Sequence, residues 1–167
     1  MIRDDAFDVA VTGMFARLPG PADIDEWMAA IGAGEVFTTR RDTDELIAAG
    51  VPAARVHDPG YVPVCGYLPD ADRFDTVLFG MSPRDAELTD PQHRLMLEAA
   101  WAALEDAGRD PLDSSVRTGV YTSSSSSAYQ RQILIGGALP HDMHDRLEVG
   151  SGQDYTATRI AYKLGQR

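Results

Sequence analysis

The sequence predicts a single domain of the α/β class, because runs typical of β-strands alternate with amphipathic helical segments along its 167 residues. A β-rich run, Phe7–Met14, leads through a short loop into a segment of helical periodicity. A second β-rich run, residues 117–123, follows a long segment with one apolar stripe. We therefore expect two buried strands and several helices packed around one core.

The first helix is predicted to begin after Asp23, whose carboxylate can accept hydrogen bonds from the amides of the first turn. From Ile24 onward, apolar side chains recur at the helical spacing i, i+3, i+4 and i+7, which predicts one buried face. Gly32 or Gly34 is expected to end this helix, because glycine readily adopts the conformation that follows a helix.

Residues 35–75 are predicted to be mostly irregular. One short helix is expected before Gly50, and four prolines then fall within residues 52–69 among several turn signals. A stretch this long with little regular structure is usually functional or specific to a family.

The segment 79–108 carries the strongest helical signals. Ser82 and Asp85 have the spacing of a capping box, and Asp90 followed by Pro91 marks the start of a longer helix. Gly108 is expected to end that helix. Its apolar stripe predicts a core helix and consists of Leu97, Trp101 and Leu104.

Beyond the second predicted strand, residues 127–137 are expected to be helical and residues 138–152 to form a polar, turn-rich loop. The last helix is predicted to be capped by Asp154 and ended by Gly165. Its apolar face consists of Ala157, Ile160, Ala161 and Leu164.

Charge and composition exclude several classes of function. The formal net charge is −11 and the pI about 4.6. Proteins that bind nucleic acids or anionic membranes usually present a basic face, so we expect neither as a partner. The sequence has no apolar run of the ~20 residues that span a membrane, and its first residues lack the features of a signal peptide. We therefore expect a cytoplasmic protein. The single cysteine, Cys65, excludes an internal disulfide and a zinc site built on paired cysteines.

Five consecutive serines, residues 123–127, directly follow the second predicted strand. A serine behind a strand is where many acyl-transfer enzymes hold their nucleophile, but a nucleophile elbow requires Gly-x-Ser-x-Gly around a strained turn. No glycine flanks this run, so a plain turn is the alternative interpretation.

The other reactive side chains form no convincing constellation. His141 and His144 lie with two aspartates among turn formers and lack a third strong ligand, so a solvated loop is favoured over a metal site. Cys65 lacks the basic neighbours or helix start that would activate a thiol, and His57 has no evident partner. His93 is the third residue of the helix that follows Asp90, where we expect it to cap or pack and not to catalyse. No glycine-rich segment has the spacing of a phosphate loop. The residues alone therefore predict a scaffold without a catalytic, cofactor or metal site.

Four segments, taken in order, resemble the N-terminal half of a β-ketoacyl synthase, most closely the ketosynthase domains of modular polyketide synthases. They read VAVTGMFARLPGPADIDEWMAAIGAG, ADRFDTVLFGMSPRDAELTDPQHRLMLEAAWAALEDAGRDP, TGVYT and DYTATRIAYKLG. The resemblance covers essentially all of residues 7–167. It implies a thiolase-like fold of layered helices and mixed sheet, of which residues 1–167 form the N-terminal region that ends before the nucleophile elbow.

The resemblance also implies a reaction and its partners. The family catalyses a decarboxylative Claisen condensation: a cysteine takes an acyl chain from the phosphopantetheine arm of an acyl carrier protein, and two histidines assist attack by a malonyl-type extender. The family works as a homodimer. No bound cofactor is expected, because the substrates arrive on phosphopantetheine.

The family's nucleophile and both catalytic histidines follow the position of Arg167, so Cys65 and the four histidines match none of them. We therefore expect no catalytic residue in this chain and no activity from it alone, with the C-terminal half of the ketosynthase as a partner. Two alternatives to this role as part of a ketosynthase remain open. The chain is a non-catalytic docking module, or it is an incomplete fragment that exposes core surface. The serine run matches the segment that borders the family's acyl pocket near the dimer interface, which makes Ser124, Ser125 and Ser126 candidates for the pocket wall.

Overall fold

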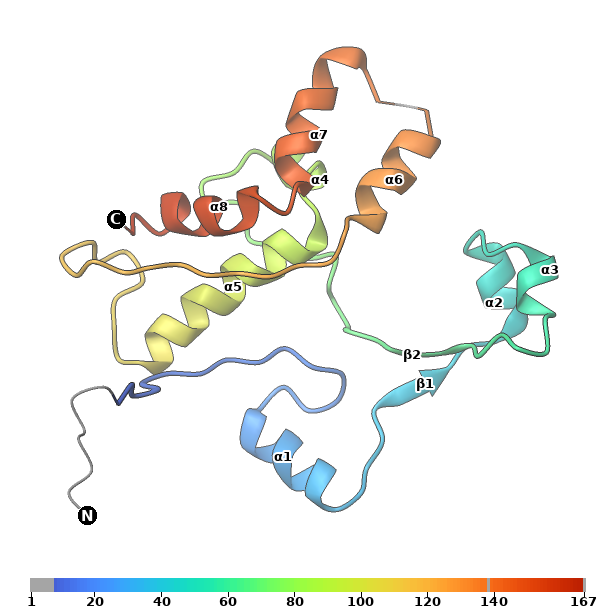
Figure 1. Ribbon diagram of the computed structural model, residues 1–167, viewed down its shortest axis with the longest axis horizontal. Coiled ribbons are helices and arrows are strands. Elements are labelled where there is room, and N and C mark those ends of the chain that lie inside the picture. The colour runs from blue at the N-terminus through green and yellow to red at the C-terminus, as the bar shows by residue number, and fades with distance from the viewer. Residues whose placement is uncertain (1–7, 138, 167) are drawn as a thin grey trace. The chain divides into compact units, whose positions relative to one another are not determined.

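The computed structural model describes residues 8–137 and 139–166, and the chain divides into two compact units. One unit comprises residues 16–70, and the other comprises residues 1–15 and 71–167. Figure 1 labels the helices and strands of each unit.

The unit of residues 16–70 contains α1 (Ile24–Gly32), β1 (Thr38–Arg40), α2 (Thr43–Ala48), α3 (Ala53–Val56) and β2 (Val64–Gly66). The predicted cap of α1 is confirmed, since the Asp23 carboxylate accepts from the amides of Asp25 and Glu26. β1 and β2 pair in antiparallel register with Thr39 opposite Cys65. The stretch expected to be irregular thus holds a small two-stranded sheet whose strands are connected through two short helices, α2 and α3.

In the described residues of the larger unit, the regular secondary structure is helical. It contains α4 (Pro83–Glu87), α5 (Pro91–Asp106), α6 (Ala128–Ile135), the 3₁₀ turn η2 (His141–Met143), α7 (His144–Ser151) and α8 (Tyr155–Lys163). The predicted helix starts at Ser82 and Asp90 are confirmed, because each side chain accepts a hydrogen bond from a first-turn amide. The predicted start at Asp154 is in place, but its side chain makes no capping hydrogen bond.

The core of this unit lies where α5 and α8 pack together. Leu97 of α5, Phe79, Ile160 and Leu164 are buried in one cluster, as the apolar stripes of the two helices predict. Trp101 and Leu104 pack against the cluster while remaining partly exposed. The rings of Phe79 and Trp101 meet edge to face with centroids 6.0 Å apart.

Both strands predicted for this unit are wrong within the described residues. Residues 8–14 and 117–123 run as extended chain without a ladder partner, and Phe7 lies outside the described residues (Figure 1). A β-rich sequence supplies side chains suited to a sheet, but a strand also needs a neighbour for its amide and carbonyl groups. Neither segment has that neighbour in the described part of the chain.

The first of these segments is nevertheless packed against α5. The amide of Met14 donates to Asp106 Oδ2 at 2.8 Å. A Cβ atom at Gly13 would lie 2.5 Å from the Ala107 nitrogen, so only glycine allows this approach.

The turn-rich loop predicted for residues 138–152 is also wrong, because η2 and α7 occupy most of it; Ala138 lies outside the described residues. The helix depends on tertiary contacts that a local pattern does not show. Leu147 is buried, and a side chain at Gly150 would overlap the carbonyl oxygen of Leu88. The predicted helix of residues 127–137 is confirmed as α6.

No helix within residues 8–137 and 139–166 is both long enough and apolar enough to cross a membrane.

Candidate functional site

The serine run lies between the extended segment 117–123 and α6, in the larger unit. Ser124 is half-buried, whereas Ser125 and Ser126 are exposed. Ser127 is the buried member of the run. The three serines predicted from the resemblance are therefore accessible, whereas Ser127, the last of the five, is buried and has a different role.

Two glutamines hold the main chain of the serine run. Gln92, in the first turn of α5, accepts the amide hydrogen of Ser125 through Oε1 at 3.0 Å. Its Nε2 donates to the Ser125 carbonyl oxygen at 3.4 Å. Gln153, just before α8, donates through Nε2 to the carbonyl oxygen of Ser124 at 2.6 Å. The run is thus tied by its backbone to the beginnings of two helices.

Ser127 joins the run to the α5 cap. Its hydroxyl donates to Asp90 Oδ2 at 2.5 Å and accepts from the amide of Gln130 at 2.9 Å, which caps α6. The other Asp90 oxygen, Oδ1, accepts from the Gln92 amide at 2.7 Å. One buried carboxylate therefore organises the N-termini of both α5 and α6.

His93 adds a second buried polar contact, which joins α5 to α8. Its side chain is 2% exposed, and Nε2 lies 2.8 Å from the Thr156 hydroxyl oxygen. Burial and the nearby Arg159 charge lower the pKa of His93, while Asp90 opposes the shift. The hydrogen bond between His93 and Thr156 joins α5 to α8, as expected for a packing residue.

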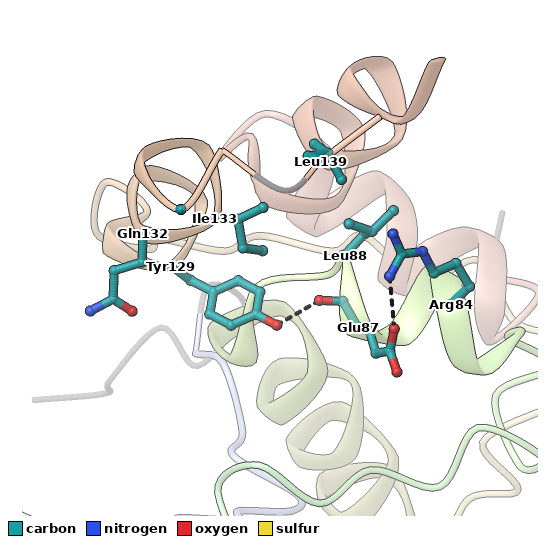
Figure 2. Close-up of a pocket in the computed structure, with 8 residues that line it drawn as sticks. Arg84, Glu87, Leu88, Tyr129, Gln132, Ile133 and Leu139 are labelled. Atoms are coloured by element: carbon teal, nitrogen blue, oxygen red, sulfur yellow. Dashed lines mark hydrogen bonds and ion pairs between the residues drawn. The ribbon is translucent and has the colours of Figure 1, made fainter. Parts of the chain in front are cut away.

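A cavity of about 420 Å³ lies beside α6, between that helix and the end of α4. Figure 2 shows its apolar wall, formed by Leu88, Ile133 and Leu139. The Tyr129 hydroxyl donates to the Glu87 carbonyl oxygen at 2.6 Å, and Arg84 pairs with the Glu87 carboxylate at 3.1 Å (Figure 2). None of the three candidate serines lines this cavity.

The remaining reactive side chains do not converge. Cys65 and His57 are exposed in the unit of residues 16–70. His141 and His144 are exposed, with ring centroids 5.4 Å apart. Across the described ranges, no group of three or more histidine, cysteine, aspartate or glutamate side chains is arranged to hold a metal ion.

Sequence reasoning missed Asp90, Gln92, Ser127 and Gln153 as parts of this site. One local signal was present, because Ser127 and Gln130 have the Ser-x-x-Gln spacing of a helix start. The contacts of Gln92 and Gln153 join residues 33 and 29 positions apart, so no local pattern contains them.

Residues 6–167 match a family model that is described as "Beta-ketoacyl synthase, N-terminal domain". Among curated proteins, a phenolphthiocerol/phthiocerol polyketide synthase polypeptide of Mycobacterium tuberculosis is 35% identical over 95% of this chain. Polyketide synthase PksN of Bacillus subtilis is 38% identical over 94% of it. The chain spans 11% and 3% of these two proteins, respectively.

Solved structures show the same likeness. Ketosynthase twelve of the bacillaene polyketide synthase from Bacillus amyloliquefaciens superposes with a TM-score of 0.74 and 31% identity, covering 95% of this chain and 28% of that one. The ketosynthase of module 1 from the bacillaene synthase of the same species gives a TM-score of 0.73 at 31% identity, over 95% and 27% of the two chains. The predicted thiolase-like α/β class is confirmed by these ketosynthase folds, although the predicted strands are unpaired here.

Proposed function

The chain belongs to the family of β-ketoacyl synthase N-terminal domains, and we propose that it supplies a wall of the acyl pocket in a polyketide-synthase ketosynthase. The observation that carries this proposal is the match of residues 6–167 to the family together with 95% coverage by ketosynthase folds. The chain covers only 28% of the first of those ketosynthase chains. We therefore propose, as a separate step, that it takes part in the reaction of a whole ketosynthase.

The proposed reaction is the decarboxylative Claisen condensation. A cysteine thiolate attacks the acyl thioester on an acyl carrier protein and releases the phosphopantetheine thiol. The malonyl-type extender then loses CO₂, and its enolate attacks the acyl-cysteine carbonyl, which frees the cysteine thiol. We assign no catalytic role to a residue of this chain, because Cys65 and the four histidines match none of the family's catalytic positions.

The proposed partners are the C-terminal half of the ketosynthase, a second copy of the enzyme and an acyl carrier protein. The unpaired segments 8–14 and 117–123 support the first of these. Val9 is 92% exposed and Tyr121 is 94% exposed, although both belong to apolar runs typical of buried strands. Added strands would satisfy the open backbone groups and cover these side chains.

The decisive experiment joins residues 1–167 to the C-terminal half of a polyketide ketosynthase and offers the product an acyl-pantetheine thioester. We expect intact mass spectrometry to show one acyl group on the joined enzyme, lost when its nucleophilic cysteine is replaced by alanine. The 167-residue chain alone should gain no acyl group.

Condensation by the chain alone would contradict the assignment of the chemistry to other residues. A joined enzyme that folds but never loads an acyl group would contradict the proposed function. If the two halves, made as separate chains and mixed, associate but load no acyl group, the result would instead favour a docking module, the second candidate, which the exposed apolar segments also fit.

Ser124, Ser125 and Ser126 are proposed to line the acyl pocket. In the joined enzyme, Ser126→Trp is expected to reduce loading of long acyl chains relative to short ones by about tenfold, because an indole ring occupies space the longer chain needs. The measurement is a competition between two acyl-pantetheine thioesters, read by mass spectrometry. Ser114→Trp, at another exposed serine, is the matched control. Unchanged selectivity in the Ser126 variant would make the run a plain turn.

A further inference from the structure

Within the serine run, Ser124 and Ser125 are held by their main chain, not by their hydroxyl groups. Gln92 both accepts from the Ser125 amide and donates to the Ser125 carbonyl oxygen, as a neighbouring strand would. Gln153 binds the carbonyl oxygen of Ser124. In the described structure, no hydrogen bond engages the hydroxyl of Ser124, Ser125 or Ser126, so these three groups are available to a ligand.

The groups that hold the run are themselves anchored. Gln92 follows the buried cap Asp90, whose second oxygen binds Ser127 at the end of the same run. Gln153 follows Gly152, which ends α7, and precedes α8, which packs on α5 in the core. Hydrogen bonds therefore connect the run, at Ser124, Ser125 and Ser127, to helices whose positions the core determines.

We propose that Gln92 and Gln153 are positioning residues that set acyl-chain selectivity by fixing the backbone of Ser124–Ser126. This inference rests on the proposed function, because it assumes that the serines line the acyl pocket. A wall built from small side chains on a loop discriminates between chains only if its backbone cannot retreat, and the two glutamines supply that restraint.

The restraint is measurable in the 167-residue chain without any enzymatic activity. Gln92→Ala removes the acceptor of the Ser125 amide, so we expect amide hydrogen exchange at Ser125, followed by NMR, to accelerate about tenfold. Gln92→Glu keeps an acceptor oxygen and should preserve most of the protection. Gln132→Ala, at an exposed glutamine of α6, is the matched control and should leave Ser125 unchanged.

Selectivity is measured in the joined enzyme. Gln92→Ala and Gln153→Ala are each expected to lower the ratio of kcat/KM between preferred and disfavoured acyl thioesters by about threefold to tenfold, through KM, with kcat for the preferred chain retained. Gln92→Glu should recover part of the ratio. A residue that only stabilised the fold would instead lower the amount of active enzyme and leave the ratio intact.

Unchanged exchange at Ser125 in Gln92→Ala would overturn the restraint. Unchanged selectivity in variants of a joined enzyme that loads normally would overturn the link to the acyl pocket, even if exchange accelerates. Failure of the unmodified joined enzyme to load any acyl group would overturn the proposed function and the selectivity role together, while the exchange experiment still decides whether the restraint exists.

Discussion

Leu97→Ala is expected to lower the free energy of unfolding of the larger unit by about 2–5 kcal/mol. Leu97 is 0% exposed and lies in the core cluster with Ile160 and Leu164 of the α8 segment. Alanine would remove most of the buried side chain and leave a cavity between helices that cannot close without losing other contacts.

Urea unfolding followed by tryptophan fluorescence measures this loss. Trp101 packs on the same cluster, and a Trp27→Phe background removes the tryptophan of the other unit, so the signal reports the α5–α8 core. The matched control is Leu112→Ala, because Leu112 is 58% exposed and its truncation should change stability by no more than about 0.5 kcal/mol. Equal losses at the two leucines would contradict the placement of the core.

Asp90→Ala is expected to cost about 2–4 kcal/mol of unfolding free energy. The change removes the side-chain cap of α5, which costs about 1 kcal/mol of stability. It also leaves the buried Ser127 hydroxyl without its acceptor, which costs a further ~1–3 kcal/mol. We also expect the loss of the Ser127 contact to loosen the start of α6, since Ser127 caps that helix.

Asp90→Asn provides the control for this prediction. Its carbonyl oxygen can still accept from the Gln92 amide, and its amide group can donate to the Ser127 hydroxyl oxygen. The asparagine variant should therefore unfold within about 1 kcal/mol of the unmodified chain, by the same fluorescence measurement. If asparagine and alanine are equally harmful, the two hydrogen bonds do not explain the role of Asp90.

Helix starts were the most predictable features of the fold. Asp23, Ser82 and Asp90 were each recognised from a few neighbouring residues, and each caps its helix as expected. Capping joins a side chain to amides two or three positions away, so the sequence contains the whole interaction. Asp154 shows the limit of the rule, because its position begins a helix although its carboxylate does not cap it.

Strands and the helix α7 were less predictable for the opposite reason. The β-rich runs at 8–14 and 117–123 have suitable residues, but their hydrogen-bond partners must come from elsewhere, and none is present in the described ranges. α7 was expected to be a loop, because the burial of Leu147 and the close approach of Gly150 to Leu88 arise only after the chain has folded back on α4.

The amino-acid order was sufficient to identify the family and the core helix at Leu97, since these depend on motifs and periodicity within short segments. The place of the serine run in an acyl pocket follows from the family resemblance and stays a prediction. The tertiary structure alone decided how that run is held. Gln92 and Gln153 reach Ser125 and Ser124 across 33 and 29 positions, and Asp90 reaches Ser127 across 37. Hydrogen bonds over such separations exist only once packing of α5, α7 and α8 has brought their ends together.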